Sequence, residues 1–175
     1  MEDPLTVVGD WKVSVFPGPT WEFFWAEGPW MVKRGGVYYL MYSGNSAMLP
    51  FYAIGVATAS DPMGPFTKYP GNPILEVDWK NFFYGPGHNS VVEAPDGALW
   101  MFYHTKDQHL VGWARSVRRN RIDFDDHGNL YVVLDDDDDD DSADDDFADD
   151  DDSGDDDAQG GDSDDDSDDD DGCGW

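Results

Sequence analysis

The fold of this chain is decided by residues 27–43, which read Glu27-Gly28-Pro29-Trp30-Met31-Val32-Lys33-Arg34-Gly35-Gly36-Val37-Tyr38-Tyr39-Leu40-Met41-Tyr42-Ser43. The Gly-Gly pair in the middle supplies the positive φ angles that a tight hairpin turn requires. The residues after it are β-branched and aromatic almost throughout, which is typical of a strand buried on both faces. The stretch therefore predicts two strands around a turn, with a carboxylate at the entrance of the first strand.

The same pattern returns later in the chain. A shift of 61 positions places Glu27 on His88 and Tyr42 on Tyr103, and the second turn contains Pro-Asp-Gly, another strong turn signal. A third strand is predicted in both copies, at residues 52–59 and 110–117. Two such meanders predict two blades of a β-propeller, in which equivalent residues of the first strands face one central channel. We therefore expect Glu27 and His88 to share a cleft.

The other apolar runs fit the same architecture. Residues 11–16 and 21–26 are predicted as outer strands of an earlier, incomplete blade, and residues 66–69 begin the fourth strand of the next one. Residues 122–124 and 130–133 flank a final turn. No stretch has the periodicity of an amphipathic helix. The predicted fold class is all-β, with about two complete propeller blades plus part of a third.

The composition changes abruptly near residue 134. Residues 1–134 hold all 10 Lys and Arg beside 14 Asp and Glu, whereas residues 135–175 hold 25 Asp and no base, and these 25 account for most of the formal net charge of −29. The first part has enough apolar side chains for a core, but the second does not. We predict one domain at 1–134, followed by an Asp-rich disordered tail at 135–175.

Several classes of function are disfavoured by composition. Cys173 is the only cysteine, so no disulfide can form within the chain. Residues 1–4 are not the start of a signal peptide, and no apolar stretch approaches the about 18 residues of a membrane-spanning helix. The acidic balance opposes binding to phosphates. Neither nucleic acid nor a membrane is an expected partner, and the compartment is not fixed.

Glu27 and His88 are the main candidate site residues. Gly28-Pro29 stiffens the backbone after Glu27 and could hold its side chain in a walled cavity, although a solvated or capping glutamate has the same spacing. His88 fits either a hydrogen-bonded structural histidine or a contact to a cation on the propeller axis. One histidine cannot hold a metal without further oxygen ligands or waters. His104 lies within a predicted strand and is interpreted as structural.

The remaining candidates are arginines, aromatic residues and the tail. One arginine of the group Arg115, Arg118, Arg119 and Arg121 could reach the channel and orient a carboxylate or sugar hydroxyls. The side chains of Trp25, Trp30, Trp79 and Phe83 either stack on a sugar ring or fill blade cores, and Trp30 and Phe83 are retained as substrate-binding candidates. The Asp-rich tail is expected to bind divalent cations weakly, without a specific site.

At these residues the chain resembles glycoside hydrolase family 43. The resemblance rests on Glu27-Gly28-Pro29 with the hairpin that follows it, on Gly85-Pro86-Gly87-His88-Asn89-Ser90, and on residues 52–65, 96–104 and 115–128 in the same order. It implies a five-bladed propeller and an inverting hydrolase for arabinose-, xylose- or galactose-containing glycans. It also implies that Glu27 is the general acid, that His88 stands near a central calcium ion, and that Arg115 contacts the substrate.

The chain departs from the family upstream of Glu27. The family takes its general base and the aspartate that tunes the acid from two earlier blades, whereas 26 residues precede Glu27 here, and Asp3 and Asp10 lack the strand pattern. We therefore expect a C-terminal portion that is inactive by itself and pairs with the missing blades or with itself. The alternative is a non-catalytic carbohydrate-binding or scaffold remnant with a cation-binding acidic tail.

Overall fold

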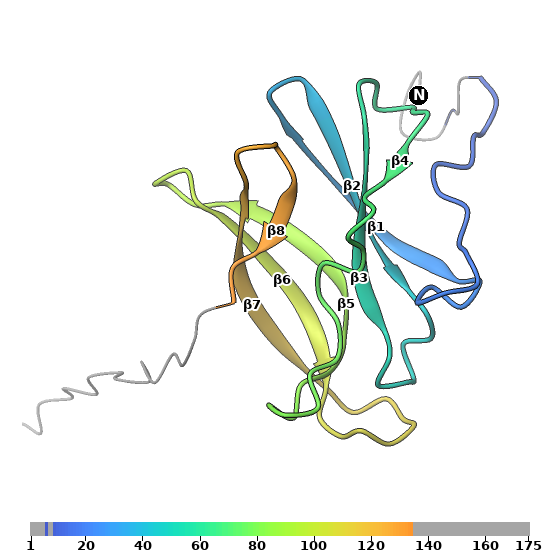
Figure 1. Ribbon diagram of the computed structural model, residues 1–175, viewed down its shortest axis with the longest axis vertical. Helices are drawn as coiled ribbons and strands as arrows, with labels where there is room; N and C mark the ends of the chain where they lie inside the picture. Colours follow the sequence, from blue (N-terminus) through green and yellow to red (C-terminus); the bar gives the residue numbers. More distant parts are fainter. Residues whose placement is uncertain (1–5, 7–8, 135–175) are drawn as a thin grey trace, which may run out of the picture. The chain divides into compact units, whose positions relative to one another are not determined.

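The computed structural model describes residue 6 and residues 9–134, which form two four-stranded antiparallel sheets (Figure 1). The first sheet has the order β1 (Ala26–Arg34), β2 (Val37–Gly44), β3 (Ala53–Ala59) and β4 (Thr67–Lys68). The second has the order β5 (Tyr84–Glu93), β6 (Leu99–Lys106), β7 (Arg115–Phe124) and β8 (Leu130–Val132). The expected tail at 135–175 lies outside the described residues.

Each sheet is a simple meander, in which strands that follow one another in sequence are neighbours. The first hairpin turns at Gly35 and Gly36, whose φ angles of 58° and 84° are those that the sequence predicted for this turn. Among the described residues no helix is long and apolar enough to cross a membrane. The all-β fold with two blade-like sheets is therefore confirmed.

The core lies where the two sheets face each other, with β5 against β1, β2 and β3. Because side chains alternate along a strand, every second residue of β2 points at the second sheet. The buried members of this core are Tyr39, Met41, Ile54, Val56, Leu75, Met101, Tyr103, Ile122, Leu130 and Val132. Apolar area buried between the sheets is thus the main force that holds them together.

The two strands predicted at residues 11–16 and 21–26 do not form. Residues 9–25 contain no strand, residues 21–24 make a turn, and β1 begins at Ala26. The aromatic run instead places Trp21 on the first sheet, where a Cβ on Gly44 or Gly55 would lie 2.5 or 2.6 Å from the indole ring. The segment thus covers the sheet by packing over two glycines and not by pairing as a strand. A run of large residues in the sequence is compatible with either arrangement.

The third strand of the second sheet is also displaced from its predicted place. Residues 110–114 form no strand, and β7 begins at Arg115 rather than at Leu110. The strand runs through the arginines because Phe102 pairs with Arg119 across β6 and β7, and Arg119 lies over the Trp100 ring at 5.0 Å. Arginine stems and guanidinium groups can cover an aromatic surface, so an apolar pattern is not required there.

The strand pairing also revises the repeat. Ser43 and His104 are 61 positions apart, but Ser43 pairs with Glu27 whereas His104 pairs with Gly87. The bulge between Glu27 and Trp30 has its counterpart between Gly87 and Ser90, so the difference comes from the turns: four residues lie between the paired Lys33 and Tyr38, whereas five lie between the paired Glu93 and Leu99. The shift of 61 therefore holds for the second strands and becomes 60 for the first, so that His88 is the counterpart of Gly28. These two residues share the left-handed conformation, with φ of 56° and 57°.

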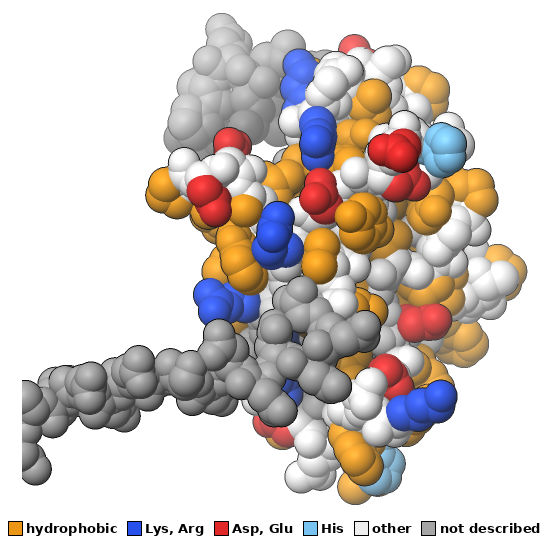
Figure 2. Space-filling view, turned by 60° about the vertical axis from the view of Figure 1, so that its left-hand side comes forward, with side chains coloured by type: hydrophobic (Ala, Val, Ile, Leu, Met, Phe, Trp, Pro, Cys, Tyr) orange, Lys and Arg blue, Asp and Glu red, His pale blue; other side chains and the backbone are white. Residues whose placement is uncertain are grey.

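One face of the second sheet has no sheet packed on it among the described residues. The shift of 61 relates Trp100 and Phe102 to Tyr39 and Met41, which the first sheet uses to pack on the second. Phe102 is 37% exposed, and Val117 on the neighbouring strand is 77% exposed. Figure 2 shows, on the side that it presents, hydrophobic side chains lying open between scattered charged ones.

Candidate active site

The candidate site is built around the hydroxyl group of Tyr52. This tyrosine immediately precedes β3 and is completely buried. Its hydroxyl donates a 2.7 Å hydrogen bond to Oε1 of Glu27, at the start of β1, and lies 3.4 Å from Nδ1 of His88 on β5. Glu27 and His88 therefore meet at one hydroxyl group, although they occupy different levels of their strands, and the shared cleft stays a prediction.

Local backbone geometry makes room for this arrangement. A Cβ on Gly87 would lie 2.0 Å from the Tyr52 ring, so only glycine lets the ring pass. The backbone N–H of His88 donates to Oγ of Ser43 at 2.7 Å, which ties β5 to β2 beside the site. The Tyr52 ring also stacks on His104, with centroids 5.5 Å apart and planes at 11°. Within residues 85–90, Gly87 thus contributes to the site as much as His88 does, because it leaves room for the Tyr52 ring.

Burial by itself raises the pKa of Glu27, but other contacts outweigh it. Hydrogen bonds from the Tyr52 and Trp25 side chains, and the charges of His88 and Arg115, bring the pKa below the ordinary value of 4.5. Burial and the same hydrogen bond to Glu27 raise the pKa of Tyr52, so its hydroxyl keeps its proton. The described residues therefore hold Glu27 as a carboxylate at neutral pH.

His104 is neutral and half-buried. Burial, followed by the charges of Arg115 and His88, lowers its pKa to about 4. Its Nε2 atom, Nε of Arg115 and Oδ1 of Asn89 are buried and have no hydrogen-bond partner among the described residues. Orphaned buried polar atoms are uncommon in folded proteins, so this cluster is chemically incomplete as it stands.

Arg115 stands in the wall of a hollow of about 380 Å³ beside His88. Its Nη2 group donates to the carbonyl oxygen of Ala47 at 3.4 Å, and its guanidinium lies 4.7 Å from the centre of the Trp113 ring. The other residues that line the hollow are Ser90, Phe102, Tyr103, His104 and Val117. Of the four arginines considered, Arg115 is the one brought to Glu27, while the remaining three are exposed on β7.

The aromatic candidates are placed differently from one another. Trp30 follows the β-bulge after Glu27 and is 40% exposed. Phe83 is partly buried and packs edge-on against Tyr103 of the core, with ring centroids 6.2 Å apart. Its role in substrate binding stays a prediction. Trp25, considered above for stacking on a sugar or for a blade core, provides a side-chain hydrogen bond to Glu27 that the spacing did not indicate.

The described residues do not form a metal site by themselves. No group of three or more His, Cys, Asp or Glu residues within 9–134 could hold a metal ion. Calcium takes six to eight oxygen ligands, and Glu27 is the single carboxylate that contacts Tyr52 in this cluster. A calcium ion near His88 would need oxygen ligands beyond the Glu27 carboxylate, from carbonyl groups, from water or from residues outside 9–134.

A second buried carboxylate, Glu22, was missed by the sequence analysis. It is 2% exposed, accepts a 2.7 Å hydrogen bond from the Tyr42 hydroxyl, and pairs with Nζ of Lys68 at 2.6 Å. Burial by itself raises the pKa of Glu22. The contacts with Lys68, Gly18 and Tyr42 outweigh burial and bring the pKa below the ordinary value of 4.5. Nothing in the run from Trp21 to Trp25 indicates this partner, because Lys68 lies 46 residues away.

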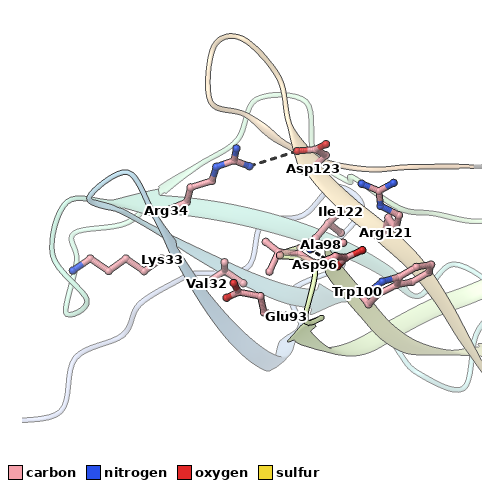
Figure 3. Close-up of a pocket in the computed structure, with 12 residues that line it drawn as sticks. Val32, Lys33, Arg34, Glu93, Asp96, Ala98, Trp100, Arg121, Ile122 and Asp123 are labelled. Atoms are coloured by element: carbon pink, nitrogen blue, oxygen red, sulfur yellow. Dashed lines mark hydrogen bonds and ion pairs between the residues drawn. The ribbon is translucent and has the colours of Figure 1, made fainter.

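A larger hollow lies elsewhere and shares no lining residue with the Glu27 cluster. It has a volume of about 640 Å³ and lies between the end of β1, the β5–β6 turn and β7 (Figure 3). Arg34 and Asp123 form an ion pair across it, at 3.5 Å. Lys33, Glu93, Asp96, Trp100 and Arg121 are among its other lining residues. Its mixed charges do not converge on one point, so it is not the candidate active site.

Comparison with known proteins points to one family. Residues 1–130 match the family described as glycosyl hydrolases family 43. The chain is 32% identical over 136 residues to a β-D-galactofuranosidase, xynD, of Aspergillus niger, covering 75% of this chain and 37% of the relative. It is 33% identical over 123 residues to an extracellular exo-α-(1→5)-L-arabinofuranosidase of Streptomyces chartreusis, covering 64% of this chain and 37% of the relative.

Solved structures extend the similarity to the fold. A thermostable family-43 glycoside hydrolase is 41% identical and superposes with a TM-score of 0.72 over 77% of this chain and 45% of its own. An α-L-arabinofuranosidase from Lactobacillus brevis is 28% identical, with a TM-score of 0.66 over 74% of this chain and 44% of its own. The chain thus spans less than half the length of these relatives. Its two sheets, its Glu27–His88 cluster and these matches agree, and the chain belongs to family 43 of the glycosyl hydrolases.

Proposed function

We propose that this chain is the part of an inverting glycoside hydrolase that carries the general acid. The observation that supports it most is the Glu27 carboxylate, which Tyr52 holds at the start of β1 close to His88 and Arg115. The proposed substrates are glycans that contain arabinose, xylose or galactose, in line with the galactofuranosidase and arabinofuranosidase names of the similar proteins.

In this proposal Glu27 gives its proton to the glycosidic oxygen as the bond to the sugar breaks. A second carboxylate takes a proton from the water that attacks the opposite side of the sugar, at about 6.5–9.5 Å from the acid. Arg115 holds sugar hydroxyls through its guanidinium donors. Glu22 cannot be the base, because it is buried against Lys68 and Tyr42. The base must then come from the portion of the relatives that this chain does not span.

The ionisation state of Glu27 also indicates that part of the active site comes from residues outside this chain. A general acid must be protonated at the working pH, whereas the described neighbours lower the pKa of Glu27. A nearby carboxylate would raise that pKa, since two like charges disfavour one another. We infer that the missing portion supplies both the base and the group that makes Glu27 an acid.

The test is complementation of this chain by the remainder of a relative. The purified chain is mixed with the N-terminal portion of the thermostable family-43 hydrolase, and aryl arabinofuranoside and aryl xyloside are the substrates. We expect no enzyme-like turnover from the chain alone and measurable turnover from the mixture. Glu27→Gln should then lower the rate by roughly 10²–10⁴-fold. The control is Glu93→Gln, at the exposed end of β5. Turnover that survives Glu27→Gln would contradict the proposal.

A non-catalytic carbohydrate-binding role is the second candidate, and the lowered pKa of Glu27 favours it. A permanent carboxylate beside a guanidinium binds sugar hydroxyls well but cannot protonate a leaving group. The same mixture distinguishes the two roles. Saturable binding of arabino-oligosaccharide, measured by calorimetry, with no turnover in any complemented sample would select the binding role.

Calcium remains part of the proposal at the level of the whole protein. His88 would contact the ion through water, because no group of three or more His, Cys, Asp or Glu residues in the described part of the chain could hold it. The unpaired Asn89 Oδ1 is the local atom best suited to such a water network. Calcium titration of the chain and of the complemented mixture, with His88→Ala as the control, would show whether binding needs the additional portion.

We also propose that the bare face of the second sheet, defined by Trp100, Phe102 and Val117, receives the missing blades. The support is the repeat, because the equivalent residues Tyr39 and Met41 pack on the second sheet. Without a cover, this face should drive association between copies of the chain. Sedimentation of the chain against Val117→Lys should show weaker association in the variant, and addition of the relative's N-terminal portion should have the same effect.

A further inference from the structure

The Tyr52 side chain has a role that goes beyond filling the core. We propose that Tyr52 is the positioning residue of the candidate site, fixing the Glu27 carboxylate through its hydroxyl and presenting it beside His88. The meaning of this role for catalysis rests on the proposed function of Glu27. The positioning itself does not, because it follows from contacts that exist in this chain alone.

The geometry leaves the Tyr52 ring little freedom. The side chain is completely buried, the ring is stacked on His104, and the ring fits against β5 because residue 87 has no Cβ. A ring locked in this way aims its hydroxyl at one place. That place is Oε1 of Glu27, at 2.7 Å. Rigid support of this kind is what holds a catalytic group in a productive orientation.

Four neighbours act on the Glu27 carboxylate, each from a different segment. Trp25 and Tyr52 donate hydrogen bonds from the residues before β1 and β3, while His88 on β5 and Arg115 on β7 contribute charge. Tyr52 has the largest lowering effect of the four, and it acts against burial, which raises the pKa. Removal of its hydroxyl should therefore loosen the carboxylate and raise the pKa of Glu27.

The chain provides its own control in Tyr42. This tyrosine is 2% exposed and donates to Glu22 at 2.7 Å, the same length as the bond from Tyr52 to Glu27. Tyr42→Phe and Tyr52→Phe therefore remove the same chemical group from equally buried rings. The two substitutions differ in which glutamate loses a hydrogen bond.

The experiment is a pH titration of the full chain, labelled with ¹³C at the side-chain carboxyl of glutamate. The chain has five glutamates, and the signal that disappears in Glu27→Gln belongs to Glu27. We expect Tyr52→Phe to raise the pKa of Glu27 by about one unit, because the carboxylate loses the hydrogen bond that lowers its pKa most. Tyr42→Phe should leave Glu27 unchanged. An unchanged Glu27 pKa in folded Tyr52→Phe would overturn the proposal.

A second measurement covers the case in which Tyr52→Phe does not fold. In the unsubstituted chain the Tyr52 hydroxyl proton should be protected from exchange, and its resonance should move as Glu27 titrates. A freely exchanging hydroxyl, or one that ignores the titration, would equally overturn the proposal. In the complemented mixture we expect Tyr52→Phe to lower kcat about 10-fold with little change in KM. Failure of all complemented samples to turn over, together with the pKa shift, would refute the proposed function and leave the positioning role intact.

Discussion

Two tyrosine–glutamate pairs sit on the first sheet, and they differ in what surrounds the carboxylate. In both pairs a buried tyrosine donates a 2.7 Å hydrogen bond to a glutamate. The Glu22 carboxylate forms an ion pair with Lys68 and accepts a hydrogen bond from the backbone N–H of Gly18. Glu27 has no lysine partner in the described residues, and its charged neighbours, His88 and Arg115, border a hollow.

The difference shows how the same contact can serve stability in one place and chemistry in another. A buried carboxylate is stable when its charge and its lone pairs are satisfied, which Glu22 achieves through three partners. Glu27 retains unsatisfied polar neighbours, such as Nε of Arg115, and this is the condition in which a ligand or another segment can still bind. The following predictions test this contrast.

The largest expected effect is the loss of Glu22. Glu22→Gln removes the charge that Lys68 and Tyr42 both use, so we expect the free energy of unfolding to fall by about 3 kcal/mol, the lower end of the range for a broken buried ion pair because Lys68 is 35% exposed. Glu27→Gln should cost less than about 1 kcal/mol. Urea unfolding of both variants measures the difference, and equal losses would contradict the contrast.

The next effect concerns the glycine that admits Tyr52. In Gly87→Ala the added methyl group would lie 2.0 Å from the Tyr52 ring, so overpacking should destabilise the chain by about 1–3 kcal/mol. Tyr52→Leu removes the ring and should recover part of this loss in the double variant. Thermal unfolding of the two single variants and the double variant gives the coupling. Strict additivity would mean that Gly87 acts through something other than Tyr52.

The pH dependence of stability should be set more by Glu22 than by Glu27. Both glutamates have a folded-state pKa below the ordinary 4.5, so each contributes stability above pH 4.5 that is lost as the pH falls through the folded-state pKa. Below pH 4.5, the free energy of unfolding should therefore depend clearly less on pH in Glu22→Gln than in the unsubstituted chain. In Glu27→Gln this pH dependence should be only slightly smaller. Urea midpoints between pH 3 and pH 6 provide the test.

The smallest expected change is in the ring resonances of His104, which should not titrate between pH 5 and pH 8. Because burial lowers the pKa of His104 to about 4, its ring should stay neutral from pH 5 to pH 8. Its folded-state pKa lies below the ordinary 6.5, so His104 should reduce stability gradually as the pH falls from about 6.5 to about 4. Proton NMR of the ring resonances, with His104→Gln for assignment, measures this. A midpoint near 6.5 would mean that the stack on Tyr52 is open to water.

Much of the fold could be predicted because it depends on local order. A Gly-Gly turn between apolar runs specifies a hairpin whatever lies around it, and the repeat of that pattern at His88 gave the second sheet. The same residues supported the family resemblance, and Glu27, His88 and Arg115 are candidate site residues on that basis. Glycine-containing turns and alternating side chains are properties of a few adjacent residues, which explains why a single sequence was sufficient for them.

Only the tertiary structure decided how these residues meet. Strand pairing and packing between distant segments set three features: the longer β5–β6 turn that makes His88 the counterpart of Gly28, the start of β7 at Arg115, and the fit of Trp21 over two glycines. The Tyr52 and Glu22 contacts join residues 25 and 46 positions apart. Such contacts produce no periodic pattern in the sequence. Their energy comes from burial and charge at one point in space and not from a repeat along the chain.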